Sequence, residues 1–527
     1  MTGFSCVNWS GAVPRVIVPR RYNAAVDFVD RNVREGRGDK IAVIDDRGSY
    51  TYGQVLERVN RAGNMIRGLG VAPEQRVLLC LSDGIDFPTC FYGAIKSGAV
   101  PIPVNTLLRG PDYDFMLRDS RAPALIVGAE HYNKFAPILD DQPFLRHVIV
   151  AGGEAGDHPR LDDLLAQSSP ELEAAPTTAD DVGFWMYSSG TTGQPKGIVH
   201  AQTDPVYTAV LFGQGIVGVN ENDVVFSAAK LFFAYGMGNA MNFPFYAGAT
   251  TVLTADRPSA ASVEAMLNRH RPTVFYGVPT LYAMLLAKQD LDLSACRETL
   301  RICVSAGEAL PRDIGLTWQA RVGVDILDGI GSTEMLQTFL SNRVDDNRYG
   351  TTGKPVPGYD IKLVDDEGRP VAPGEVGELL VKGPSMAIGY WNQRDKSRAT
   401  FLGPWFKSGD KFIRDADGYF TYAGRADDML KVGGIWVSPF EVESTLVSHQ
   451  AVLEAAVIGK PDHDDMVKPK AYVVLNAGYV ACETLEAELK EHVKTTLARY
   501  KYPRWIEFVD DLPKTATGKI QRFKLRP

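Results

Sequence analysis

The sequence lacks the features that would place the protein across a membrane, outside the cell or on a nucleic acid. Among its 527 residues, no apolar run reaches the roughly 18 that a membrane-spanning helix needs. The first residues, MTGFSCVNWSGAVPR, show no charged segment followed by an apolar one, so we expect no secretory signal. The formal net charge is −8, whereas proteins that bind nucleic acids or anionic membranes usually carry an excess of basic residues.

Cysteine is also scarce. The chain has six, none in a Cys-x-x-Cys pair: Cys6, Cys80, Cys90, Cys296, Cys303 and Cys482. This scatter favours reduced thiols in a cytoplasmic protein over a disulfide framework or a zinc site. With 45% hydrophobic and 23% charged residues, the composition is that of a globular protein long enough for more than one domain.

From residue 40 to about 310, short apolar segments alternate with helical patterns. KIAVIDD and RVLLCLS read as buried strands, and TYGQVLERVNRAGNMIRGLG reads as a helix that stops at Gly70. APALIVGA, RHVIVAGG, DVVFSAA, GATTVLTA, PTVFYGVP and LRICVSAGEAL continue the series, interrupted by a polar surface excursion over residues 152–181. Such alternation predicts an α/β fold with mainly parallel sheets.

Beyond Gly350 the pattern changes to short strands and turns. YDIKLVDDEGRPVAPGEVGELLVKG is typical of β-hairpins. After GRADDMLKVGG comes a compact tail with its own strands and a helix, VLEAAVIG, AYVVLN and TLEAELKEHVKTTLA. We therefore divide the chain into an N-terminal domain (1–424), a hinge (425–428) and a C-terminal domain (429–527).

One loop, YSSGTTGQPKG (187–197), carries the strongest chemical signal. Glycines and hydroxyl residues present backbone N–H groups and hydroxyls to an anion, and the lysine adds a positive charge. Because strand-like segments flank it and Pro195 stiffens it, we interpret it as an ordered phosphate-binding loop rather than a linker. It is not a Walker A motif, since Gln194 and Pro195 separate Gly193 from Lys196. GQGIVG (213–218) matches a dinucleotide-binding string, but it lies in a helix and turn without the required strand.

This loop and six further motifs resemble those of the acyl- and aryl-CoA synthetases, the ANL adenylate-forming enzymes. In the family's order they are FFAYG (232–236), SAGEAL (305–310), DGIGSTE (328–334), FKSGD (406–410), GRADDMLKVGG (424–434) and PKTATGK (513–519). The resemblance implies a large α/β domain with a small β-barrel-like subdomain, followed by a small mobile α+β domain. It also implies two half-reactions: a carboxylate and ATP give an acyl-adenylate and pyrophosphate, and the thiol of coenzyme A then displaces AMP.

The resemblance assigns an ATP site. Its expected members are Ser188, Ser189, Gly190, Thr191, Thr192, Lys196, Gly307, Glu308, Ala309, Asp328, Gly329, Ile330, Asp410 and Arg425. Thr333 would touch the α-phosphate, and Glu334, with Thr191, would hold Mg²⁺, a hard cation suited to oxygen ligands. Apart from the resemblance, Glu334 could be an acid in the first turn of a helix, and Asp410 could be a turn residue.

The tail supplies the catalytic lysine of this interpretation. Lys519 would bridge the carboxylate and the α-phosphate, although a tail lysine is usually only solvated. Asp427, rather than its neighbour Asp428, matches the family's hinge residue. The family further implies a coenzyme A site at Lys431, Gly433, Gly434 and Trp436, a possible homodimer, and a lysine acetyltransferase and deacetylase acting on Lys519. Many relatives carry a basic residue in place of Trp436, which puts one phosphate contact in doubt.

KLFFAYGMGNA, DGIGSTEML and KVGGIWVSPFEVE look most like the benzoate and hydroxybenzoate CoA ligases. There the flat ring would lie among Phe233, Ala234, Tyr235, Tyr276, Gly329, Ile330, Gly331 and Gln337, where aromatic faces and glycines form a slot. Gln337 replaces a histidine common in benzoate ligases. Its amide could pair with a ring hydroxyl, or it could simply face solvent or the next helix.

Three other functions stay open at this point. The chain could load an aryl acid onto the thiol of a carrier protein, or it could activate another cyclic or short carboxylic acid. From another class, it could be a nucleotide-binding regulator without turnover, although a binder needs no bridging lysine.

Overall fold

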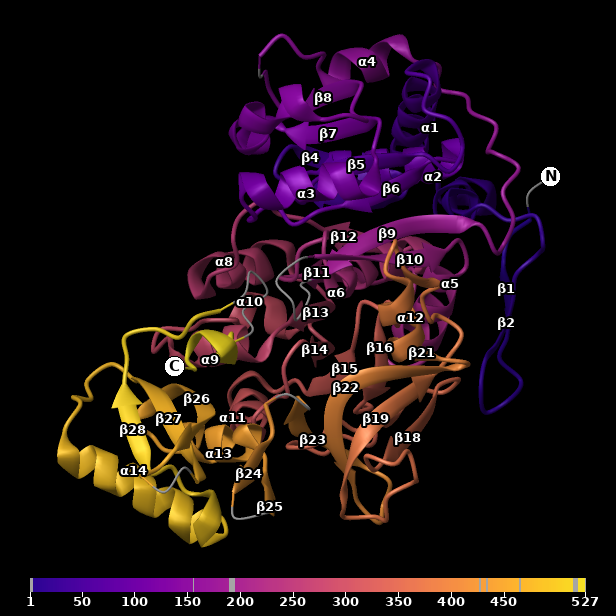
Figure 1. Cartoon of the computed structure of the whole chain (residues 1–527). Coiled ribbons are helices and arrows are strands. Elements are labelled where there is room, and N and C mark those ends of the chain that lie inside the picture. Colours follow the sequence, from indigo (N-terminus) through magenta and orange to yellow (C-terminus); the bar gives the residue numbers. More distant parts are fainter. Residues whose placement is uncertain are drawn as a thin grey trace.

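The computed structural model describes residues 3–154, 156–188, 195–425, 428–432, 435–463, 466–514 and 520–526. Colour in Figure 1 follows the chain from an indigo N-terminal region at the top, through a magenta centre and an orange β-rich part, to a yellow C-terminal part. No helix in these ranges combines the length and the apolar character needed to cross a bilayer. The α/β class expected from the sequence is confirmed.

A nine-stranded sheet forms the centre of the molecule. Its order is β17-β16-β15-β14-β13-β11-β12-β3-β4, parallel from β15 to β3 and antiparallel at both ends. The strands are β3 (Ile41–Asp45), β4 (Gly48–Thr51), β11 (Val224–Ser227), β12 (Thr250–Val252), β13 (Val274–Gly277), β14 (Ile302–Ser305), β15 (Ile326–Gly331), β16 (Thr338–Ser341) and β17 (Lys354–Pro355). Because the parallel strands end at one edge, the motifs that follow them meet there.

A second sheet of four parallel strands lies above it in Figure 1, in the order β6-β5-β7-β8. Its strands are β5 (Arg76–Cys80), β6 (Val100–Pro103), β7 (Ala124–Gly128) and β8 (His147–Ala151), accompanied by α1 (Tyr52–Gly68), α2 (Asp86–Ser97), α3 (Gly110–Ser120) and α4 (Leu161–Gln167). Helix α1 begins where the Thr51 hydroxyl accepts the Gln54 N–H, and Gly70 (φ +72°) turns the chain just after it ends, as predicted. The polar segment 152–181 contains one helix that was not predicted, α4. This helix forms because Leu161 and Leu165 are buried against neighbouring elements.

Between these sheets runs a three-stranded antiparallel sheet, β20-β10-β9, which carries the phosphate loop. It consists of β9 (Val182–Ser188), β10 (Lys196–Ala201) and β20 (Gly389–Tyr390). The remaining helices of the large domain are α5 (Asp204–Thr208), α6 (Ala234–Met237), α7 (Phe243–Ala247), α8 (Ala260–His270), α9 (Pro279–Ala287), α10 (Ser294–Arg297), α11 (Arg312–Val322) and α12 (Arg394–Thr400), with π-helical segments at Val26–Asp30, Ala209–Gln214 and Gly238–Asn242. The GQGIVG string thus begins in a helix, as predicted.

The β-rich part is a five-stranded antiparallel sheet. It comprises β18 (Asp360–Val364), β19 (Val376–Lys382), β21 (Phe401–Leu402), β22 (Trp405–Arg414) and β23 (Phe420–Arg425), and the β18–β19 pair is the predicted hairpin. This sheet corresponds to the small β-rich subdomain of the expected fold.

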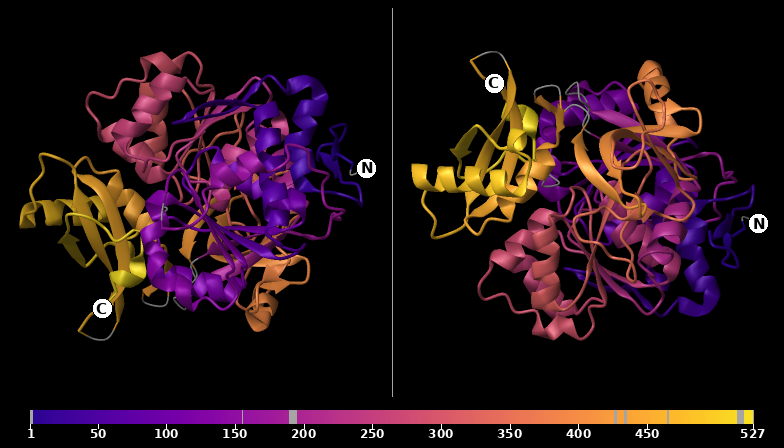
Figure 2. Two further views of the ribbon diagram at one scale, coloured as in Figure 1. Left: turned by 90° about the horizontal axis from the view of Figure 1, so that it is seen from above. Right: turned by 90° about the horizontal axis from the view of Figure 1, so that it is seen from below.

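The C-terminal part has its own core. Strands β26 (Val452–Pro461), β27 (Val467–Leu475) and β28 (Trp505–Phe508) form a sheet, with α13 (Pro439–Val447), α14 (Glu483–Thr496) and a ribbon of β24 (Leu430–Val432) and β25 (Ile435–Val437). Both views of Figure 2 place it to one side, away from the N-terminal residues. A separate core favours the predicted boundary, which we retain as a proposal.

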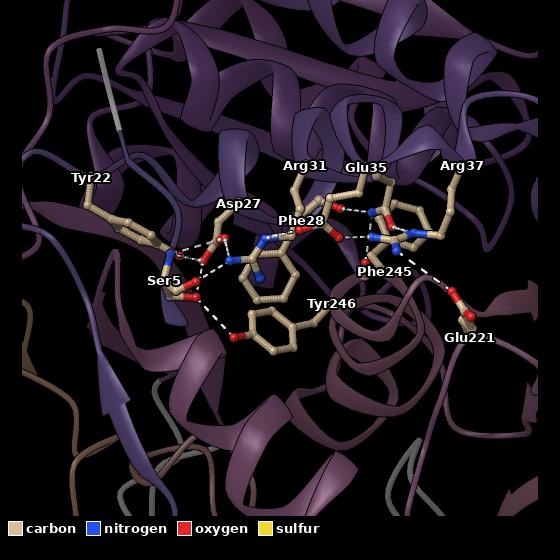
Figure 3. Close-up of polar contacts among 11 residues, drawn as sticks. Ser5, Tyr22, Asp27, Phe28, Arg31, Glu35, Arg37, Glu221, Phe245 and Tyr246 are labelled. Carbon is tan, nitrogen blue, oxygen red and sulfur yellow. Dashed lines mark hydrogen bonds and ion pairs between the residues drawn. The ribbon is translucent and has the colours of Figure 1, made fainter. Parts of the chain in front are cut away.

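The N-terminal segment, with its ribbon of β1 (Cys6–Asn8) and β2 (Arg15–Ile17), is fastened to the large domain by the polar network of Figure 3. The Ser5 hydroxyl donates to Asp27 Oδ2 at 2.5 Å and lies 3.0 Å from the Tyr246 hydroxyl. Tyr22 donates to the same carboxylate, and Arg31 pairs with it at 2.9 Å. These buried contacts join the N-terminal segment to the helices beneath it.

A second polar cluster ties together the starts of three central strands, on the edge opposite the site. Arg301, just before β14, donates to both oxygens of Asp223 at 3.0 and 2.8 Å, and the Thr273 hydroxyl donates to the same carboxylate at 2.6 Å. Burial would raise the pKa of Asp223, but the hydrogen bonds from Arg301 and Thr273 outweigh it and lower that pKa.

We expect Asp223→Asn to lower stability at neutral pH by about 2 kcal/mol, because bonds to a charged group are lost. The folded-state pKa lies below the unfolded value of about 4, so the contribution is complete above pH 4 and disappears as the pH falls through the lowered pKa. Urea unfolding between pH 3 and 7 should therefore show a flatter acid slope for the variant. Asp360→Asn, in an exposed pair with Lys382, serves as the control. Parallel pH profiles for wild type and Asp223→Asn would contradict this prediction.

Candidate active site

The phosphate loop joins two paired strands. Ser188, at the end of β9, is the register partner of Lys196, at the start of β10, so both ends of the loop are fixed side by side. Ser188 Oγ is buried and has no hydrogen-bond partner among the described residues. The predicted loop residues Ser189, Gly190, Thr191 and Thr192 lie outside the described residues.

Lys196 and Glu334 form the charged centre of the site. Their Nζ and Oε1 atoms are 2.6 Å apart, and the two side chains are only 15% and 10% exposed. The Tyr390 hydroxyl donates to the same Oε1 at 2.9 Å and lies 3.0 Å from Nζ. Burial would raise the pKa of Glu334, but the Lys196 ammonium and the hydrogen bonds outweigh it, and the pKa is lowered. The carboxylate is therefore ionised at neutral pH.

A buried histidine holds the segment that carries Thr333 and Glu334. His200 Nε2 donates to the Thr333 carbonyl at 2.8 Å, while Nδ1 lies 2.8 Å from Asp204 Oδ2. The ring stacks on Phe184 with centroids 5.2 Å apart. No sequence pattern marks His200 as functional, yet it fixes the backbone of two predicted site residues.

The edge of the central sheet presents further polar atoms. Ser305 and Asp328 are register partners on β14 and β15, and each has a buried oxygen without a partner among the described residues, Oγ and Oδ1. Burial raises the pKa of Asp328 well above its usual range. Gly307 follows in the left-handed region (φ +97°), where a side chain would be strained. Unsatisfied buried polar atoms at a strand edge fit a polar ligand such as a nucleotide.

Asp410 and Arg425 lie opposite each other on β22 and β23. Arg425 Nη1 donates to Asp410 Oδ1 at 3.0 Å and to the Ser408 carbonyl at 3.1 Å. The structure thus brings together two residues predicted for the ATP site.

The predicted acid pocket gathers residues from four elements. Phe233 precedes α6, which begins with Ala234 and Tyr235, while Tyr276 lies on β13 and Gly329, Ile330 and Gly331 lie on β15. The Tyr235 hydroxyl donates to the Gly277 carbonyl at 3.2 Å, and its ring meets Tyr276 edge to face, with centroids 6.3 Å apart. A Cβ on Gly331 would stand 2.5 Å from the Gln337 carbonyl oxygen, so only glycine fits there.

Gln337 is 3% exposed, so the interpretation in which it faces solvent is wrong. Its Nε2 donates to the Tyr235 carbonyl at 3.2 Å and lies 3.4 Å from Asn239 Oδ1, while its Oε1 accepts the Thr338 N–H at 3.0 Å. Leu336 adopts φ +63°, unusual for a non-glycine residue, where the chain turns from Glu334 to Gln337. The amide therefore packs on α6, and sequence reasoning missed its neighbour Asn239.

A hydrogen bond joins the C-terminal domain to this site. The Ile520 N–H, directly after Lys519, donates to Glu308 Oε1 at 3.1 Å. Lys519, the hinge residue Asp427, and Gly433 and Gly434 lie outside the described residues. For Lys431 and Trp436 the structure describes only the backbone, which pairs across β24 and β25. Their roles stay predictions.

Comparison with known proteins agrees with this geometry. A family profile described as "AMP-binding enzyme" matches residues 29–391, and one described as "AMP-binding enzyme C-terminal domain" matches residues 441–519. The chain belongs to the AMP-binding enzyme family. It is 57% identical over 528 residues to a benzoate–CoA ligase of Thauera aromatica, covering 100% of both chains. It is 51% identical to a 4-hydroxybenzoate–CoA/benzoate–CoA ligase of Rhodopseudomonas palustris, over 96% of this chain and 94% of the other.

Among solved structures of the family, the anthranilate CoA ligase AuaEII in complex with anthranoyl-AMP superimposes with a TM-score of 0.92. It is 46% identical, and the alignment covers 97% of each chain.

The chemistry of the site fits the Mg²⁺ that enzymes of this family use. Glu334 offers a buried, ionised carboxylate, and Ser188 Oγ is a buried oxygen whose partner is missing among the described residues. Hard oxygen donors of this kind suit Mg²⁺, which binds through a few carboxylates together with substrate phosphates. No cluster of three or more acidic, histidine or cysteine ligands occurs in the described ranges.

Proposed function

We propose that this protein is an AMP-forming aryl-CoA ligase, which converts benzoate or a hydroxybenzoate, ATP and coenzyme A to the aryl-CoA thioester, AMP and pyrophosphate. The observation that carries the proposal is the buried Lys196–Glu334 pair at the end of the phosphate-loop hairpin. The similarity over the full length to ligases for benzoate and 4-hydroxybenzoate supports the substrate class.

The first half-reaction brings a carboxylate oxygen to the α-phosphorus of ATP, so the protein must neutralise charge and align the two groups. Lys196 and the hydroxyls of the phosphate loop would hold the β- and γ-phosphates, and Thr333 the α-phosphate. Glu334 would hold Mg²⁺, which would supply further charge neutralisation. Asp410 would accept hydrogen bonds from the ribose, and Asp328 and its neighbours would line the adenine.

In the second half-reaction the small domain must present coenzyme A instead of Lys519. We propose that it rotates about residues 425–428, with Asp427 at the hinge. The bond from Ile520 to Glu308 supports the placement of the Lys519 loop against the nucleotide side of the site. The ribbon of β24 and β25, with Lys431 and Trp436, would then serve the pantetheine arm.

A panel of acids tests the function. With coenzyme A present, we expect AMP and pyrophosphate from benzoate and hydroxybenzoates, and at least tenfold lower kcat/KM for cyclohexanecarboxylate and short fatty acids, which fill a flat aromatic slot poorly. Replacing coenzyme A with a pantetheinylated carrier protein is the comparison arm. Preference for the carrier, or release of ADP and phosphate, would contradict the proposal.

Three finer features rest on the resemblance and on composition alone. We propose a homodimer, to be tested by sedimentation, and reversible acetylation of Lys519, to be tested by mass spectrometry. We also propose a cytoplasmic location, from the scatter of the six cysteines along the sequence.

A further inference from the structure

One short segment connects the phosphate-loop strand to the loop of the metal-binding acid. The Ala387 N–H donates to the Glu334 carbonyl at 2.8 Å, and the Trp391 N–H donates to the Gly197 carbonyl at 2.8 Å. Between these two bonds, β20 pairs with β10, and Ile198 is the register partner of Tyr390. The backbone of residues 387–391 therefore fixes the two halves of the charged pair relative to each other.

The side chain of Tyr390 touches both charged groups with different atoms. Its hydroxyl has one proton, which it donates to Glu334 Oε1 at 2.9 Å, and a lone pair that accepts from Lys196 Nζ at 3.0 Å. The same Nζ lies 4.4 Å from the ring centroid, within reach of a cation–π contact. Tyr390 is 7% exposed, its N–H donates to Ser397 Oγ at 3.0 Å, and its ring packs against Phe401, so it has little freedom to move.

Ligand binding would disturb this pair. At 2.6 Å, Lys196 and Glu334 largely satisfy each other. In the proposed reaction the ammonium must turn donors toward phosphate oxygens and the carboxylate must turn an oxygen toward Mg²⁺. Each side chain would then lose part of its interaction with the other. Both are flexible, so holding them in the productive rotamers would cost conformational entropy.

We propose that Tyr390 is the positioning residue of this pair: its hydroxyl keeps Glu334 aimed at the metal position, and its ring face keeps Lys196 beside the phosphates. The inference rests on the proposed nucleotide site and adds to it a residue outside the seven sequence motifs. Tyr390 itself touches neither the reacting carboxylate nor phosphorus in this scheme.

Two variants separate the hydroxyl from the ring. Tyr390→Phe removes the hydroxyl, with its bonds to Glu334 and Lys196, and keeps the ring. Tyr390→Leu also removes the aromatic face below Lys196. Binding of the α,β-methylene analogue of ATP to the full-length protein, measured by calorimetry over a range of Mg²⁺ concentrations, reports both effects without turnover. We expect Tyr390→Phe to raise the Mg²⁺ concentration for half-maximal binding about tenfold, and to change binding without Mg²⁺ less than about twofold. Tyr390→Leu should additionally weaken binding without Mg²⁺ about threefold.

Tyr349→Phe is the matched control, because that half-buried tyrosine also donates to a carboxylate, Asp325, at 2.8 Å, away from the site. An unchanged Mg²⁺ requirement in Tyr390→Phe would overturn the proposal. So would an equal loss of binding with and without Mg²⁺ accompanied by a lower Tm, since that pattern marks a purely structural residue. If the wild type binds the analogue but turns over no aromatic acid, the proposed substrate fails while the positioning role of Tyr390 is still decided by the binding curves.

Discussion

Lys519→Ala should abolish formation of the acyl-adenylate while sparing the transfer of an acyl group from a supplied adenylate to coenzyme A. The physical reason is that the lysine's charge is needed only while a carboxylate oxygen approaches the negatively charged α-phosphate. Loss of one such stabilising donor costs on the order of 10²–10³-fold in rate. Benzoate-dependent exchange of pyrophosphate into ATP measures the first step, and thioester formation from benzoyl-adenylate measures the second.

The neighbouring Lys514 gives a matched control in the same loop. It pairs with Glu454 at 2.6 Å and Asp511 at 3.1 Å within the C-terminal domain. Lys514→Ala should therefore leave both half-reactions within about twofold of the wild type, since neither of its two partners belongs to the proposed ATP site. Equal losses in both half-reactions for Lys519→Ala would argue against its bridging role.

Glu334→Gln should give the second large loss, on the order of 10²-fold in adenylation. The amide keeps the shape of the side chain but removes the negative charge that balances Lys196 and the oxygen ligand proposed for Mg²⁺. Raising the Mg²⁺ concentration should restore part of the rate, and pyrophosphate exchange at increasing Mg²⁺ measures this.

Glu378→Gln tests whether the loss of any buried carboxylate lowers the adenylation rate and changes its Mg²⁺ dependence. Glu378 is 13% exposed and pairs with Lys407 at 3.0 Å in the β-rich sheet. We expect its loss to affect the Tm and not the Mg²⁺ dependence. A Glu334→Gln enzyme with normal adenylation would remove the metal role from this residue.

Sequence reasoning found the elements whose signal is local. The strands β3, β5, β7 and β8 and the four parallel strands from β11 to β14 follow from short apolar runs, and α1 follows from helical spacing with a Thr51 cap. It missed α4, because a helix of two turns inside a polar stretch shows only Leu161 and Leu165, whose burial depends on distant partners.

The site shows the same division. Lys196, Glu334, Asp410 and Arg425 were predicted because each stands in a motif, and the structure joins them in pairs, while their roles stay proposals. Tyr390 and His200 were not singled out as functional, since each contacts a predicted site residue far away in the chain: Tyr390 and Glu334 are 56 positions apart, and His200 and Thr333 are 133 positions apart.

The sequence by itself determined the family and the α/β class, because the motifs and the alternation of strands and helices are local patterns. It also predicts phosphate binding by the loop, from glycine, hydroxyl and lysine side chains in fixed order. Only the tertiary structure decided how the charged pair is held, that Gln337 faces α6, and that the N-terminal segment is bonded to the large domain. The reason is physical: burial and hydrogen-bond geometry arise from strands and helices that meet in space, and the pairing of β20 with β10 brings together residues about 190 positions apart.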